Sequence, residues 1–205
     1  MHRSMKKLCL SVAAIMLFVN ILFSQKVYSS KKDVYATKEI MFYGYDYTGF
    51  RIADAKRIGQ DLKKTVFFWI GFLNEHITEK KLISWLDKDR VTFDFDPTVA
   101  LNKKLKSEDL GVATKHTISK DSIQSFIDKY EVKEKEGIGF VVIVECFDND
   151  AKRTSAYFTF FDIATKKILM SDYISSRDGN SYNRVADWGT ALILAFKKYL
   201  KVYNG

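Results

Sequence analysis

The feature that most constrains the fold is a series of three strand-like segments between residues 139 and 175. The first, GFVVIVECF at residues 139–147, is apolar on both faces apart from Glu145. Such a run is typical of a central strand that is covered on both sides. Two more segments, residues 154–163 and residues 167–175, follow after short turns. The sequence therefore predicts a sheet built from neighbouring strands near the carboxyl end of the chain.

The final segment, residues 181–203, has the clearest helical pattern in the chain. Apolar and aromatic residues recur along one face, among them Val185, Trp188, Leu192 and Phe196. This spacing predicts an amphipathic helix that packs across the sheet. We expect Trp188 to lie at the centre of that packing.

The stretch FDIATKK, residues 161–167, joins two of the predicted strands. Aspartate supports such turns by accepting hydrogen bonds from its own backbone, and lysines suit the exposed side. Asp162 is therefore interpreted as a turn residue and not as part of a chemical site.

Residues 38–50 read as a strand, with Tyr43, Tyr45 and Tyr47 predicted on one face and Gly44 marking a bulge or a turn. Helical spacing runs through residues 51–76. Its second half, TVFFWIGFL at residues 65–73, is apolar all round. That half fits either a deeply covered helix or a buried strand.

The middle of the chain carries two helix signals and one strand signal. Thr78 and Ser119 stand where N-caps are expected, before short apolar stripes. Residues 90–97 alternate, with Asp94 and Asp96 on the polar face of a predicted strand that Pro97 closes.

These segments predict an α+β fold with a mixed sheet of about five strands and helices packed mainly on one face. We assign residues 38–205 to a single domain and residues 25–37 to a polar leader. With residues 1–24 removed, only Cys146 remains of the two cysteines, so no intramolecular disulfide can form.

The amino-terminal segment has the layout of a secretory signal peptide. Basic residues precede an apolar run from Leu8 to Phe23, and small polar residues follow it. We assign residues 1–24 to this signal, with cleavage after Ser24 or Ser29. The protein is then exported, periplasmic or extracellular, with no stable membrane span after cleavage. An uncleaved anchor is the alternative.

The net charge of +8 does not indicate nucleic-acid binding. Basic residues alternate with acidic ones, as in DAKRIGQDLKK, and do not form one stripe. They are interpreted as a solvated face, and we expect no nucleic-acid partner.

From about Gly137 to Tyr203 the order of elements is similar to that of a group of bacterial envelope domains. A buried strand is followed by a hairpin strand ending FDIATKKIL, a further strand and a closing amphipathic helix. This order resembles the curli-secretion lipoproteins, the amino-terminal domain of the TolB protein of the Tol-Pal system, and lipoprotein activators of penicillin-binding proteins. The chain lacks the lipid-bearing cysteine of many of those proteins. It looks equally like uncharacterised exported single-domain proteins of bacteria.

Few residues are candidates for chemistry, and we assign no catalytic residue and no cofactor. His76, His116 and Cys146 lack the spacing of a zinc site. Asp94 and Asp96 could hold a divalent cation or serve glycoside hydrolysis.

The tyrosine run Tyr43, Tyr45 and Tyr47 could bind a partner or a glycan, because tyrosine combines apolar area with a polar tip. The leading hypothesis is a non-enzymatic envelope protein that binds a partner or supports an assembly. A glycan- or cation-dependent hydrolase using Asp94 and Asp96 is one alternative, and a small-ligand-binding module is another. The sequence leaves the oligomeric state open.

Overall fold

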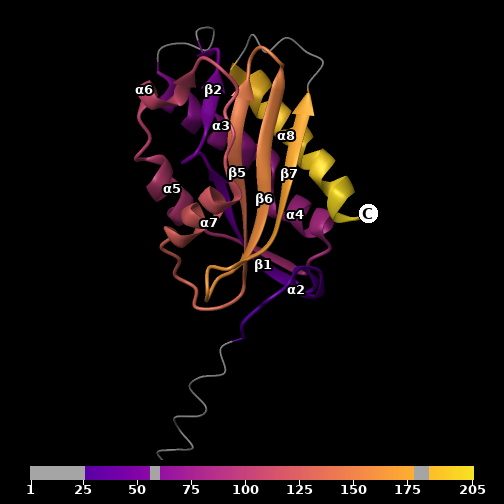
Figure 1. Cartoon of the computed structure of the whole chain (residues 1–205). Coiled ribbons are helices and arrows are strands. Elements are labelled where there is room, and N and C mark those ends of the chain that lie inside the picture. Colours follow the sequence, from indigo (N-terminus) through magenta and orange to yellow (C-terminus); the bar gives the residue numbers. More distant parts are fainter. Residues whose placement is uncertain (1–25, 56–60, 178–184) are drawn as a thin grey trace, which may run out of the picture.

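Strand β5 (Ile138–Asp148) is the centre of the sheet, and all of its residues are buried. The computed structural model describes residues 26–55, 61–177 and 185–205. On one side, β5 pairs in parallel with β1 (Glu39–Asp46) and then with β2 (Arg51–Ala53). On its other side, β5 pairs antiparallel with β6 (Arg153–Asp162). Figure 1 shows this arrangement.

Three further strands complete a mixed sheet of seven strands in the described residues. β7 (Ile168–Arg177) pairs antiparallel with β6. β3 (Arg90–Phe93) is parallel to β1, and β4 (Gly111–Val112) is parallel to β2. The predicted α+β class with a mixed sheet is confirmed, but the number of strands is larger than the five expected. The excess arises because β1 and β2 lie end to end along β5, and each takes its own outer neighbour.

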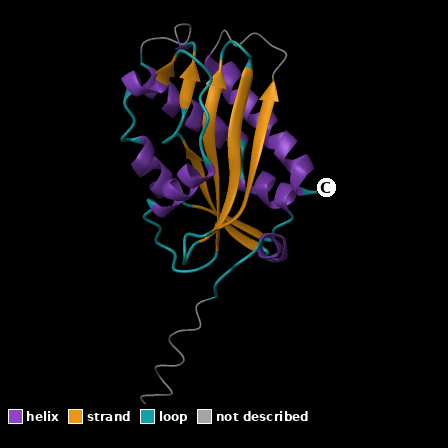
Figure 2. Cartoon of the chain, viewed as in Figure 1, coloured by secondary structure: helices purple, strands orange, loops and turns teal. Residues whose placement is uncertain are grey.

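Helices cover both faces of the sheet, as Figure 2 shows. The described helices are α2 (Lys31–Ala36), α3 (Leu62–His76), α4 (Glu79–Leu86), α5 (Asp96–Asn102), α6 (Ser107–Leu110), α7 (Lys120–Asp128) and α8 (Val185–Tyr203). The longest two, α3 and α8, lie side by side with α4 on one face (Figure 1). The shorter α7 packs on the opposite face.

The larger core lies between the sheet and helices α3 and α8. Phe147 of β5 sits between two tryptophans, with its ring centroid 4.7 Å from that of Trp69 and 4.7 Å from that of Trp188. Both tryptophans are buried. The prediction that Trp188 is central to the packing of the last helix is therefore confirmed.

Helix α3 settles the two alternatives left open for residues 65–73, because that stretch is helical. Its inner face is buried, whereas Phe68 on its outer face is 50% exposed. The predicted helix does not extend back to residue 51, since Arg51–Ala53 forms β2. Residues 56–60 of the predicted helix lie outside the described residues.

The helix starts predicted at Thr78 and Ser119 are confirmed. The hydroxyl of Thr78 accepts a hydrogen bond from the backbone N–H of Lys81, and that of Ser119 from the N–H of Ser122. Each bond satisfies one of the backbone donors that a helix leaves free in its first turn.

The predicted leader, residues 25–37, is part of the fold from Lys26 onward. Ser30 and Asp33 form a capping box that starts α2. The backbone N–H of Tyr28 donates to the carboxylate of Asp162 at 2.9 Å. Residues 1–24 lie outside the described residues. No helix in the described ranges has the length and apolar character needed to cross a bilayer.

Candidate binding surface

The three tyrosines of β1 and the residues after it do not form a surface. Gly44 takes a positive φ of 81°, and the pairing of β1 with β5 shifts register between Phe42 and Tyr45. An extra residue in one strand changes the face on which the following side chains lie. Tyr43 therefore lies in the core under α7, while Tyr45 and Tyr47 lie in the core under α3 and α8.

All three rings are buried. Burial raises the pKa of Tyr43, of Tyr45 and of Tyr47, so each phenol stays protonated at neutral pH. The prediction that they share one face is wrong, and in this structure they contribute packing and not contact with a partner.

Asp94 and Asp96 do not lie on a strand, because β3 ends at Phe93 and Pro97 falls in the first turn of α5. Asp94 accepts a hydrogen bond from the backbone N–H of Asp96 at 3.1 Å. Asp96 in turn forms an ion pair with Lys133. This ion pair lowers the pKa of Asp96, and Asp94 adds to the field that raises the pKa of Lys133. The two carboxylates thus start a helix and face a lysine.

The two histidines and the cysteine do not form a ligand cluster within the described residues, although the backbone of His116 lies against the thiol of Cys146. His76 is exposed at the end of α3 and stacks on Phe72 with ring centroids 4.2 Å apart. Cys146 is buried, and burial raises the pKa of its thiol, so the reactive thiolate is disfavoured. No group of three metal-ligating side chains occurs within the described ranges.

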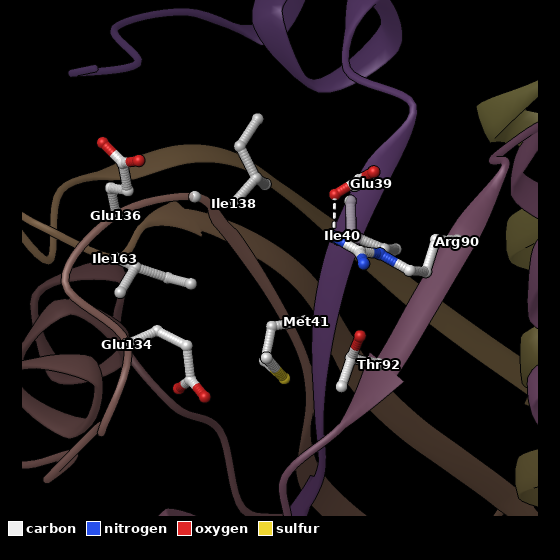
Figure 3. Close-up of a pocket in the computed structure, with 10 residues that line it drawn as sticks. Glu39, Ile40, Met41, Arg90, Thr92, Glu134, Glu136, Ile138 and Ile163 are labelled. Carbon is white, nitrogen blue, oxygen red and sulfur yellow. Dashed lines mark hydrogen bonds and ion pairs between the residues drawn. The ribbon is translucent and has the colours of Figure 1, made fainter. Parts of the chain in front are cut away.

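A polar groove lies where β1, β3 and β5 begin. Figure 3 shows Glu39 and Arg90 on one wall, with Glu134 and Glu136 on the other. The groove contains a cavity of about 180 Å³, which adjoins a second one of about 450 Å³ lined in part by Lys26.

Every carboxylate drawn in this groove already has a partner within the chain. Glu39 pairs with Arg90, and Glu134 accepts from the phenol of Tyr43 at 3.3 Å. Glu136 accepts from the backbone N–H of Lys26 at 3.2 Å. We therefore interpret the groove as the contact region between the amino-terminal segment and the sheet.

The outer edge of β7 offers a different kind of site. In the described part of the chain, β7 pairs with β6 and with no other strand. The carbonyl oxygen of Ser175 accepts from the ammonium of Lys198 on α8, at 2.7 Å. The backbone groups of Ser175 therefore point away from β6, and by alternation so do those of Tyr173 and Ser171. No other strand pairs with these outward groups in the described residues, and all but the Ser175 carbonyl, which Lys198 holds, can pair with another extended chain without losing that contact.

A tyrosine pair stands beside this edge. Tyr157 of β6 and Tyr173 of β7 are directly opposite each other, with ring centroids 5.1 Å apart. The side chain of Tyr173 is 44% exposed, and that of Tyr157 is half-buried. Next to them, Thr159 and Ser171 share a hydrogen bond of 2.8 Å across the strands. This arrangement gives an amphipathic surface on the face opposite α8.

Glu145, the one acidic residue within the run GFVVIVECF, lies under this surface. Its carboxylate accepts from the backbone N–H of Ile118 at 2.9 Å, and the phenol of Tyr157 donates to the carbonyl of Ile118 at 3.1 Å. Burial, with a contribution from the Glu145 carboxylate, raises the pKa of Tyr157 and that of Tyr173. Both phenols therefore remain protonated hydrogen-bond donors at neutral pH.

The far end of the same surface is positively charged. Arg153 and Arg177 are directly opposite each other and exposed. Like charges in this position destabilise a strand pair. Together with Lys198, they favour an acidic group on whatever covers this end of the edge.

Sequence reasoning did not find this surface, because it treated the hairpin only as a turn. The turn assignment itself is correct, since Asp162 accepts from the backbone N–H and the hydroxyl of Thr165, at 2.7 and 2.6 Å. The register could not be inferred from the turn. Pairing the strands outward from Asp162 and Lys167 at constant register would place Tyr157 opposite Asp172. A bulge between Phe160 and Phe161 shifts the pairing by one residue, so that Tyr157 lies opposite Tyr173.

The comparisons with known proteins give no relative. No protein family, curated protein or solved structure matches the chain.

Proposed function

We propose that the protein is an exported cell-envelope component that acts by binding a partner and not by catalysis. The leader pattern of residues 1–24 supports export, and the order of elements resembles that of the TolB amino-terminal and curli-secretion envelope domains. The observation that carries the proposal is the unpaired outer edge of β7 beside the Tyr157–Tyr173 pair.

In the proposed complex, an extended segment of a partner protein adds to β7 as a further strand. Outward backbone groups of Ser171, Tyr173 and Ser175 supply main-chain hydrogen bonds, which give affinity in this mode of recognition. Side chains of the added segment contact the exposed ring of Tyr173, and an acidic residue on it faces Arg177. The ammonium of Lys198 must release the carbonyl of Ser175, which makes pairing with chance partners less favourable.

A pair of proline variants tests this. Ser175→Pro removes an outward N–H, and a proline is tolerated at an edge where the N–H faces solvent. Ser176→Pro is the matched control for the direction of the backbone N–H. The N–H of Ser176 points toward β6, so its loss removes a hydrogen bond between β6 and β7. We expect Ser175→Pro to fold and Ser176→Pro to be strongly destabilised.

The binding measurement uses residues 25–205 immobilised and exposed to envelope extract from the producing cells. A specifically retained protein is then purified and its affinity measured against the wild type, Ser175→Pro and Tyr173→Ala. We expect each variant to bind at least about ten-fold more weakly. Val202→Ala, which shortens an exposed apolar side chain on α8, serves as the control and should bind normally. No retained protein, or equal retention by all variants, would count against the proposal.

A further inference from the structure

Helix α3 has an outer face that no described part of the chain covers. Phe68 is 50% exposed at its centre, and Gly71 lies next to it, also exposed. A methyl group built at Gly71 would have no atom within 4 Å. The outer face of α3 therefore carries a large aromatic side chain beside an open gap.

Packing against the described parts of the chain does not explain the glycine at this position. Glycine weakens a helix relative to alanine, so a mid-helix glycine usually has a packing reason. Gly189 on α8 has one, because a methyl group there would lie 2.5 Å from the ring of Phe72. Gly71 has no such neighbour among the described residues. A partner that approaches α3 from outside would supply the reason.

The residues along the outer side of α3 are arranged symmetrically about the middle of the helix. Lys64, Phe68, Gly71 and Glu75 follow one another at intervals of four, three and four residues, which places them along one side of a helix. The four buried residues of α3 lie on the opposite side. Lys64 and Glu75 are exposed, and neither takes part in a salt bridge within the described residues.

We propose that α3 is the contact surface of a homodimer, in which two copies of this helix pack antiparallel about a two-fold axis. The axis passes between Trp69 and Ile70. The ring of Phe68 then lies over Gly71 of the second copy, where the missing side chain lets the helices approach closely. Lys64 of each copy meets Glu75 of the other.

The flanking residues obey the same symmetry. Phe67 and Phe72 stand on either side of these four residues and are both half-buried. In the antiparallel register, Phe67 of one copy lies level with Phe72 of the other, and the two rings border the contact on opposite sides. Phe72 is held in place by stacking on Phe68, with centroids 6.5 Å apart, and on His76. A parallel arrangement would instead place Lys64 against Lys64 and Glu75 against Glu75.

A charge swap tests the register directly. The self-association of residues 25–205 is measured by sedimentation, with an expected dissociation constant on the order of 10–100 µM, since one helix pair is a small interface. Lys64→Glu or Glu75→Lys alone replaces two attractive contacts with two repulsive ones. Each should weaken the dimer about ten-fold or more. The double variant Lys64→Glu/Glu75→Lys should restore it, whereas Lys197→Glu, an exposed change on α8, should have no effect.

Gly71→Gln separates association from folding. The side chain has room in the monomer and is a better helix former, so the melting temperature in dilute solution should rise by about 2–4 °C. In the dimer the same side chain fills the gap that Phe68 of the second copy needs, so association should be lost.

Three results would overturn the proposal. The first is a wild-type chain that stays monomeric at ten times the expected dissociation constant. The second is a dimer that none of these variants weakens, which would place its interface elsewhere. The third is a dimer that the single charge changes weaken but the swap does not restore. None of these variants touches β7, so the outcome is independent of the function proposed above.

Discussion

Replacing Phe147 by leucine is expected to destabilise the protein more than the lost side-chain volume alone would. The ring has three aromatic neighbours at close range, Trp69 and Trp188 at 4.7 Å and Phe50 at 4.8 Å between centroids. Each such pair is worth about 0.5–1.5 kcal/mol beyond the area it buries. Leucine keeps most of the apolar volume but loses all three pairs. We therefore expect Phe147→Leu to cost about 2–4 kcal/mol.

The assay is urea unfolding followed by tryptophan fluorescence, since two of the neighbours are the reporters. The control is Phe68→Leu, the same change at an exposed position of α3, measured in dilute solution. It should stay within about 0.5 kcal/mol of the wild type. A loss below about 1 kcal/mol for Phe147→Leu would contradict this prediction, because Phe147 would then not join α3 and α8 to the sheet.

A double-mutant cycle sharpens the test. Trp188→Ala should cost about 3–5 kcal/mol, because Trp188 is buried and stacks on Phe147 at an interplanar angle of 8°. Residues in contact do not contribute additively. The combined variant Phe147→Leu/Trp188→Ala should therefore lose less than the sum of the two single changes.

Two other predictions concern the amino-terminal segment and high pH. Asp162→Ala leaves the N–H groups of Tyr28 and Thr165 without their acceptor, so urea unfolding should show a loss of about 2–4 kcal/mol. Because this contact needs residue 28, amino-terminal sequencing of the exported protein should find a start at or before Lys26. A start at Ser30 would contradict it. Burial raises the pKa of Tyr45 and of other core tyrosines, so the folded state keeps protons that the unfolded chain loses near pH 10. Stability should fall as pH rises above about 10, and phenolate absorbance should appear only with unfolding. Phenolate absorbance that rises before unfolding would show the rings to be accessible.

Local signals in the sequence predicted those elements whose stabilising contacts are also local. The caps at Thr78 and Ser119 and the turn at Asp162 depend on hydrogen bonds that span three residues. Such contacts can be inferred from spacing alone. The closing helix and the apolar central strand were predicted from long, unambiguous patterns.

The predictions that failed are those that required knowledge of the backbone or of a distant partner. The bulge at Gly44 moves Tyr45 to the other face, and one glycine in a strand does not say which residues it shifts. Residues 51–53 match a helical stripe, yet pairing with Cys146 and its neighbours makes them a strand. Pro97 was interpreted as the end of a strand, but proline is also favoured in the first turn of a helix.

The candidate surface at β7 could be predicted only in part. Alternation predicts which side chains of the hairpin share a face, but the register that places Tyr157 opposite Tyr173 depends on a bulge between Phe160 and Phe161 that the turn does not reveal. That β7 is the last strand depends on which strands pair on the other side of β5, and these are more than 80 residues away in the chain. Tertiary pairing of this kind leaves no local signal.

The most direct test of the account is amide hydrogen exchange along β7. In the free protein, the amides of Ser171, Tyr173 and Ser175 should exchange fast, and those of Asp172 and Ile174 should exchange slowly. Binding of the captured partner should then protect Tyr173 and Ser175. An already protected Tyr173 in the free protein, or no change on binding, would contradict the claim that this edge is the binding site.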